Sequence, residues 1–152
     1  MNEITLPTEL ERALARPDVD FLKQVIAEQY AWHSAESSDR GNEDLVLDPI
    51  IFDQDDPERN LALVAIAMAT YDDEDYLGLV SAGILEDIFF MEQHVPNALL
   101  QRIETEALKN PRFRWMLSGM YTDSFKPECR ELVHRLTVGL SIEDALPPMA
   151  GL

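Results

Sequence analysis

Apolar residues recur at helical spacing along most of the chain, and capping residues divide this pattern into short segments. Thr8 and Glu11 have the spacing of a capping box, which predicts a short helix that ends near Pro17. Asp18 can then cap a longer helix that runs to about residue 34. The apolar positions of this longer helix follow the i, i+4 pattern of one buried face and comprise Phe21, Leu22, Val25, Ile26 and Tyr30.

A strong helix start follows at Asp56-Pro57, where Asp can cap the helix and Pro suits its first position. The segment after it, ERNLALVAIAMATY, is apolar around most of its circumference. We therefore predict that it forms the central and most buried helix. The acidic tetrapeptide DDED at 72–75 is expected to end this helix and to begin the next one, which Gly83 is expected to break.

The stretch AGILEDIFF at 82–90 contains two carboxylates, Glu86 and Asp87, among apolar or small residues. If Gly83 caps a new helix, Glu86 occupies the third helical position, where it can bond back to the cap amide. Asp87 is one residue further along, and both charges favour the positive end of the helix dipole. We therefore attribute the two acids to a helix start rather than to catalysis.

Later helix starts are predicted at Pro96, Pro111 and Pro127, and Ser141 with Asp144 can cap a final turn. The chain is thus predicted to be all-α, with seven or eight short helices. They are expected to pack as antiparallel pairs, with solenoid-like stacking as an alternative. No clean sequence repeat supports true repeats.

Residues 36–56, ESSDRGNEDLVLDPIIFDQDD, depart from the helical pattern. Their polar start is typical of a loop, and short apolar pieces follow that Pro49 divides. A small strand pair and an extended segment packed on helices both fit this pattern. Because such a connection is long for a compact domain, it is a candidate binding loop.

A chain of 152 residues with 46% apolar residues is expected to form one globular domain. We divide it into N-terminal helices (1–35), the irregular segment (36–56), a helical core (57–146) and a tail (147–152). No apolar run approaches the ~20 residues that span a bilayer, and the N-terminus lacks the features of a secretory signal. The single cysteine excludes an internal disulfide framework, and these features together predict a cytoplasmic protein of bacterial type.

Negative charge is concentrated in the middle of the chain, whose formal net charge is −17. Residues 36–94 hold 16 acids and 2 bases, whereas residues 99–135 hold 7 bases and 5 acids. Such a field repels nucleic acid and anionic lipid and attracts basic partners. The same acidity is also explained by solubility alone.

Three stretches resemble an uncharacterised bacterial all-helical domain family over residues 56–121. They are DPERNLALVAIA (56–67), AGILEDIFF (82–90) and RIETEALKNPRFRWMLSGMY (102–121), and the spacing between them agrees with the family pattern as well. The resemblance implies an all-helical fold. It brings no established activity and therefore no catalytic residues.

Known catalytic and metal-binding patterns are not completed in this sequence. Glu131 and His134 have the E-x-x-H spacing of di-iron bundles, but no second such motif is present. Residues 53–58 begin like a calcium loop and then place Pro and Glu where a ligand and Gly are required. Cys129 lies on the apolar face of its helix and is expected to be buried. We predict no catalytic residue, no metal and no cofactor.

We therefore expect a non-enzymatic domain that binds a basic protein, by analogy with immunity proteins that neutralise toxins. The alternatives are a helical scaffold that self-associates into a homo-oligomer and, third, an enzyme that uses carboxylates. Trp115 is expected either to cover a helix junction or to anchor a partner. The candidate partner-binding residues are Asp53, Asp55, Asp72, Asp73, Asp75, Glu86, Asp87, Phe90 and Trp115.

Overall fold

The computed structural model describes residues 8–35, 56–89 and 95–149 and builds them from helices, which confirms the predicted all-α fold. The segment 36–55 lies outside the described residues, so the predicted loop or strand pair is not tested. The elements in chain order are α1 (Glu9–Leu14), α2 (Val19–Ser34), α4 (Pro57–Thr70), α5 (Glu74–Val80), the π-helix η2 (Ser81–Leu85), α6 (Glu86–Ile88), α7 (Asn97–Lys109), α8 (Pro111–Leu117) and α9 (Pro127–Leu136).

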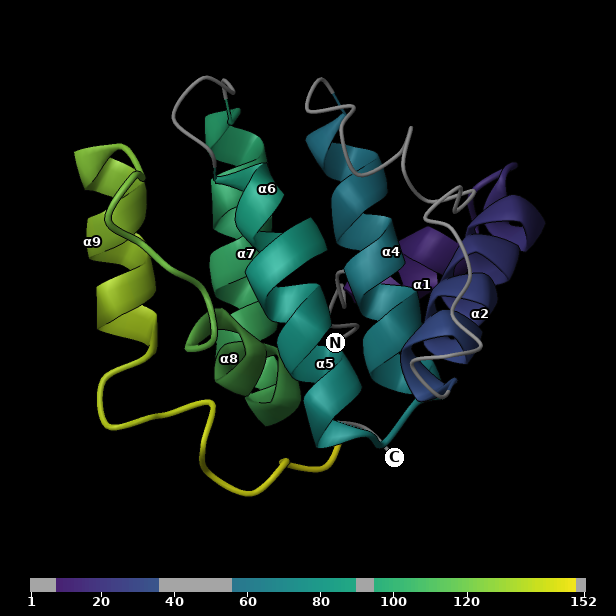
Figure 1. The fold of residues 1–152 in the computed structure, drawn as a ribbon. Coiled ribbons are helices and arrows are strands. Elements are labelled where there is room, and N and C mark those ends of the chain that lie inside the picture. Colours follow the sequence, from purple (N-terminus) through teal and green to yellow (C-terminus); the bar gives the residue numbers. More distant parts are fainter. Residues whose placement is uncertain (1–7, 36–55, 90–94, 150–152) are drawn as a thin grey trace, which may run out of the picture.

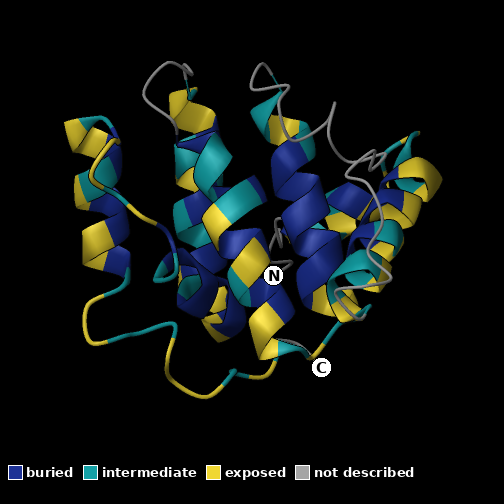
Figure 2. Ribbon diagram, in the orientation of Figure 1, coloured by how far each residue is buried: buried dark blue, intermediate teal, exposed yellow. Residues whose placement is uncertain are grey.

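The helices gather around α4, which is the most buried element as predicted. Figure 1 shows α2, α4, α7 and α9 side by side, with α5, η2 and α6 in front of them and α1 behind α4. Every residue of α4 from Asn60 to Met68 is buried, and Figure 2 shows this as the dark blue middle of the helix. A helix that is apolar all round needs neighbours on all sides, and this arrangement supplies them.

Local capping sets several helix starts as the sequence predicts. The Thr8 side chain accepts the Glu11 N–H at 3.1 Å, and the Glu11 carboxylate accepts the Thr8 N–H, which completes the capping box. The Asp56 side chain accepts the Arg59 N–H at 2.9 Å. Asp18 differs, because its carboxylate forms two hydrogen bonds with the Arg16 guanidinium instead of capping α2.

The predicted helix break at Gly83 is wrong. α5, η2 and α6 form one continuous helical segment from Glu74 to Ile88, in which Gly83 lies inside the π-helical turn. A glycine inside a helix costs about 1 kcal/mol relative to alanine. Burial of one apolar face that continues through the segment offsets this cost, and that face comprises Tyr76, Leu77, Val80, Ile84, Leu85 and Ile88.

The chain after α9 returns across α8 as an extended segment. Trp115 Nε1 donates to the Asp144 carbonyl at 3.0 Å, and Arg112 Nε donates to the Pro147 carbonyl at 2.8 Å. The predicted turn at Ser141 and Asp144 is present, since the Asp144 carboxylate accepts the Ser141 N–H. This segment therefore covers the side chains of α8 and holds them in the core.

Candidate protein-binding face

The acidic turn 72–75 lies between α4 and α5 and is held by contacts to distant parts of the chain. Asp73 caps α5 through the Tyr76 N–H at 3.1 Å and also accepts the Tyr30 hydroxyl at 3.1 Å. Asp72 forms an ion pair with Arg112 at 2.7 Å, although 83% of its side chain is exposed. The turn is thus fixed in place by Asp73, while the Asp72 carboxylate faces solvent.

The remaining two acids of the turn are both exposed. Glu74 accepts the Leu146 N–H at 3.1 Å, which ties the returning C-terminal segment to the start of α5. Asp75 lies in the first turn of α5, where its charge favours the positive end of the helix dipole. Three predicted partner-binding residues, Asp72, Asp73 and Asp75, are therefore brought together at one end of α5.

A cluster of three tyrosines adjoins this acidic turn. Tyr30 and Tyr71 stack with their ring centroids 3.8 Å apart, and both are partly exposed. Tyr76 meets both rings edge-on at 5.0 and 5.5 Å, and its buried hydroxyl donates to Gln29 at 2.7 Å. Burial raises the pKa of Tyr76 far above its ordinary value. The stacked pair was not among the predicted site residues, although the position of Tyr71 directly before the acidic turn is a signal in the sequence.

Glu86 and Asp87 form a second acidic cluster at the other end of the same helical segment. Because the helix is continuous there, neither acid sits at a helix start, and the explanation by N-terminal capping is wrong. Glu86 instead accepts the Tyr121 N–H at 2.6 Å and so holds the loop that leads to α9. Burial raises the pKa of Asp87 to about 6, and the neighbouring charge of Glu86 adds to the shift.

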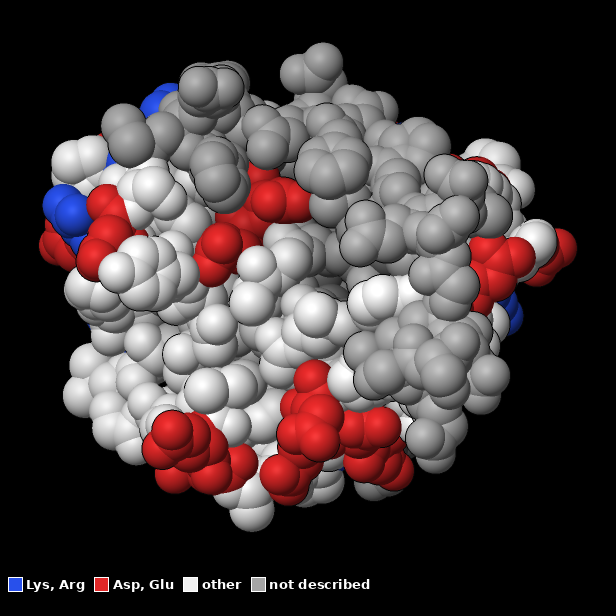
Figure 3. Space-filling view, in the orientation of Figure 1, with Lys and Arg blue, Asp and Glu red and all other residues white. Residues whose placement is uncertain are grey.

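An apolar strip connects the two acidic clusters along the outer side of α5 and η2. It consists of Gly78, Leu79, Ala82 and Gly83, of which Leu79 is 39% exposed. A Cβ atom added to either glycine would meet nothing within 4 Å. Figure 3 shows this face, with separate acidic clusters around a white centre that lacks charged side chains and with Lys and Arg confined to its edges. We name the strip and its two acidic clusters the acidic face.

The other predicted site residues do not join the acidic face. Asp53, Asp55 and Phe90 lie outside the described residues. Trp115 is only 1% exposed, so the prediction that it anchors a partner is wrong. The short helix α8 packs into the core, and the segment after α9 accepts the indole N–H, which leaves no part of the ring available to another protein.

The described ranges hold no group of three or more His, Cys, Asp and Glu residues that could bind a metal ion. Glu131 and His134 are both exposed on α9, and His134 contacts the Thr122 hydroxyl rather than an acid. Cys129 is buried as predicted, and its burial together with the charge of Glu128 raises the thiol pKa. None of the helices in the described parts is both long and apolar enough to cross a bilayer.

These features define an all-helical domain with an acidic, partly apolar face. The chain belongs to a family of unknown function, DUF6869, whose profile matches residues 33–139. The match includes the stretch 56–121, where the sequence resembles an uncharacterised family. It leaves out α1 and the segment that returns across α8. Searches of curated proteins and of solved structures found no match.

Proposed function

We propose that this protein is a non-enzymatic binding domain whose acidic face docks a basic helix of another protein. The observation that carries the proposal is the apolar strip of α5 and η2, which has open space above both glycines and carboxylates at each end. A helix with an apolar centre and basic residues at both ends complements this pattern. A basic toxin that the protein neutralises is the partner class that we favour.

The two glycines support a partner that approaches closely. Each lies in a helical segment, where glycine is about 1 kcal/mol less favourable than alanine. Neither is required by the packing of the described chain, because the space above each Cβ position is open. Both residues have negative φ, since the positive-φ glycine among the described residues is Gly139. Glycine at these two positions allows the backbone of a partner to pack closely against the strip.

Electrostatics and aromatic contacts supply the rest of the recognition. Clustered carboxylates speed association with a basic protein and select against acidic ones. The exposed parts of Tyr30 and Tyr71 lie beside Asp72 and Asp73, so an incoming Arg or Lys can stack on a ring while pairing with a carboxylate. Such contacts are worth about 0.5–2 kcal/mol each.

The two other candidate functions receive less support. A second copy of the chain would bring its own acids against the acidic face, and like charges across an interface oppose association. An enzyme that uses two carboxylates needs both of them free for substrate. Glu86 is instead committed to the backbone of Tyr121 at 2.6 Å.

The proposal is tested by capturing the partner from cells of the native organism and then measuring its affinity with purified variants. Gly78→Gln and Gly83→Gln fill the strip, and Asp75→Asn removes an exposed charge. We expect each to weaken binding at least tenfold, and we expect the wild-type affinity to fall steeply from 50 to 500 mM NaCl.

Matched controls separate the acidic face from general effects of size and charge. Ala27→Gln adds nearly the same bulk at an exposed position of α2, and Glu131→Gln removes an exposed charge from α9. Both are expected to bind as the wild type does. A partner that binds all variants equally, or whose affinity ignores salt, contradicts the proposal.

A further inference from the structure

Two neighbouring pockets lie on the opposite side of α4 from the acidic face, where α1 meets α4 and α7. The pocket between α1 and α7 has a volume of about 160 Å³, and the one between α1 and α4 has about 220 Å³. Glu9, Arg12 and Arg102 line both pockets, so the two form one groove along α1. Figure 1 places α1 behind α4, away from α5.

The groove gathers cationic side chains in a strongly acidic protein. The chain has 12 Lys and Arg against 29 Asp and Glu. Arg12, Arg16 and Arg102 all line the pocket between α1 and α4, and Lys109 lines the other pocket. The α1–α4 pocket also contains the carboxylates of Glu9 and Glu58, so its lining carries one excess positive charge.

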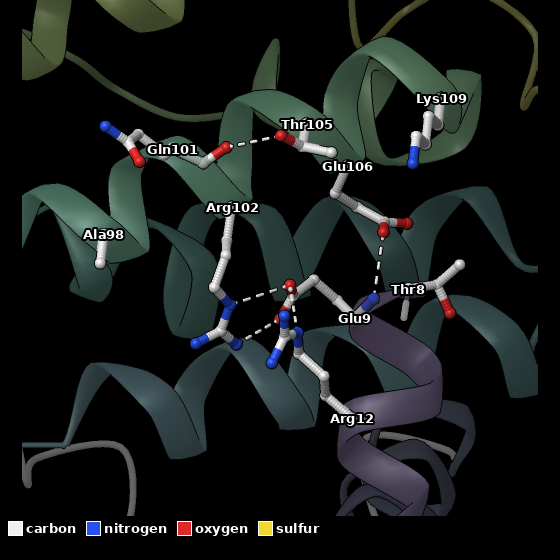
Figure 4. Close-up of a pocket in the computed structure, with 9 residues that line it drawn as sticks. All are labelled: Thr8, Glu9, Arg12, Ala98, Gln101, Arg102, Thr105, Glu106 and Lys109. Atoms are coloured by element: carbon white, nitrogen blue, oxygen red, sulfur yellow. Dashed lines mark hydrogen bonds and ion pairs between the residues drawn. The ribbon is translucent and has the colours of Figure 1, made fainter. Parts of the chain in front are cut away.

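Arg102 is the fixed member of this cluster. Its Nη2 and Nε donate to the two oxygens of Glu9 at 2.6 and 3.1 Å, and its Nη1 donates to Glu58. These hydrogen bonds raise the already high pKa of Arg102, so its charge is permanent. Figure 4 shows the guanidinium groups of Arg102 and Arg12 both reaching the Glu9 carboxylate. Arg102 thus forms ion pairs with both acids of the pocket, which together carry one more negative charge than it balances.

Arg12 and Arg16 keep N–H groups available for a ligand. Arg12 Nε lies 3.5 Å from the Glu9 carboxylate and has no hydrogen-bond partner among the described residues. Arg16 uses Nε and Nη2 to bind Asp18, which leaves its Nη1. Arg12 lies on α1 and Arg16 lies in the bend that follows it, and both side chains line the pocket between α1 and α4.

We propose that the pocket between α1 and α4 binds a small tetrahedral oxyanion of the phosphate class, with Arg12 and Arg16 as its donors and Arg102 as a fixed cation behind them. The three guanidinium groups come from α1, from the bend after it and from α7, and donors that converge from different elements suit an anion with oxygens in several directions better than a planar carboxylate. The acidic charge of the whole protein opposes nucleic acid, whose many phosphates extend beyond the pocket. The ligand is therefore a free phosphate or a small phosphate ester.

Thermal unfolding in phosphate and in chloride at one ionic strength tests this site. Binding to the folded state is expected to raise the wild-type Tm by about 3 °C at a phosphate concentration ten times Kd. The variant Arg12→Gln/Arg16→Gln is expected to lose most of that rise. Phosphate also stabilises proteins by exclusion from their surface, so a rise in the wild-type Tm alone does not show binding. The decisive quantity is the difference in this rise between the wild type and the double variant.

The matched control is Lys23→Gln/Arg130→Gln, which removes the same charge from α2 and α9. It is expected to retain the wild-type response. If phosphate raises the Tm of the wild type, the double variant and the control equally, the proposed site is wrong. If acetate raises the wild-type Tm as much as phosphate does, the site does not select a tetrahedral anion. Glycerol 3-phosphate at the same concentrations distinguishes an ester ligand from inorganic phosphate.

Should the double variant unfold, the NMR signals of the guanidinium Nε–H groups in the wild-type protein decide the question. Phosphate titration is expected to shift the signals of Arg12 and Arg16 and to leave that of Arg130 unchanged. Absence of any selective shift at Arg12 and Arg16 overturns the proposal. Neither result depends on the acidic face, so the two proposals can fail separately.

Discussion

Asp87 shows how one side chain can work against the stability of the fold. It lies half-buried beside Glu86, and burial raises its pKa to about 6. Because this folded-state pKa is above the ordinary value of 3.8, the folded protein holds the proton more tightly than the unfolded chain. The protonated form of Asp87 therefore contributes stability that is fully present below about pH 4 and is lost as the pH rises through 6.

Asp87→Asn is therefore expected to stabilise the protein at neutral pH. After allowance for solvent screening of a half-exposed group, we expect a gain of about 1 kcal/mol at pH 7.5 that shrinks towards pH 5. Urea unfolding at pH 5, 6 and 7.5 measures it, since lower values approach the pI of about 4.3. The exposed Asp75→Asn serves as control, and a gain that does not depend on pH contradicts the assignment.

Arg102 also acts at the scale of single residues, because it compensates a nearly buried acid. The Glu9 side chain is 6% exposed and forms a bidentate pair with Arg102. Arg102→Met is expected to lower the free energy of unfolding by about 2–4 kcal/mol, since Glu9 is left without its main partner. Urea unfolding checks this loss. Glu9→Gln in the same protein is expected to restore part of it, and no recovery argues against the pair.

The segment from α5 to α6 is the element that joins both acidic clusters. It stays helical although it contains two glycines, which have a low helix propensity. Gly78 and Gly83 have open space at the Cβ position, whereas a Cβ on Gly119 would lie 2.8 Å from Ile142 and 3.0 Å from Ser81. The same substitution therefore has opposite expected effects at different glycines. This contrast separates helix propensity from packing.

Gly78→Ala and Gly83→Ala are each expected to stabilise the isolated protein by about 0.5–1 kcal/mol, because alanine loses less backbone entropy in a helix. Gly119→Ala is expected to destabilise it by about 1 kcal/mol, because the added methyl overfills the contact with Ile142. Thermal unfolding of the three variants gives the order of their stabilities. Destabilisation at 78 or 83 would show that these positions are not open.

At the scale of the whole molecule, a net charge of −17 makes the compact state repel itself. We expect the isolated protein to gain about 1 kcal/mol of stability between 50 and 500 mM NaCl, as salt screens this repulsion. Urea unfolding at the two salt concentrations measures the change. Partner binding is expected to respond in the opposite direction, and a protein that loses stability with salt would show that its ion pairs dominate.

Local pattern was enough to determine much of the fold. The capping box at Thr8, the Asp56-Pro57 start and the apolar circumference of α4 depend on residues within a few positions of one another. The acidity of the turn 72–75 and the burial of Cys129 were likewise predictable. Helix periodicity and helix capping depend on residues that are close together in the sequence, so a single sequence is sufficient to recognise them.

Tertiary structure alone decided where those elements meet. Gly83 continues a helix because a neighbouring core buries the apolar face on both sides of it, and Trp115 is buried because a segment about 30 residues later covers it. Arg102 reaches Glu9 across 93 positions of sequence, and Tyr30 stacks on Tyr71 from another helix. Such contacts depend on the packing of distant segments, which leaves no periodic signal in the chain.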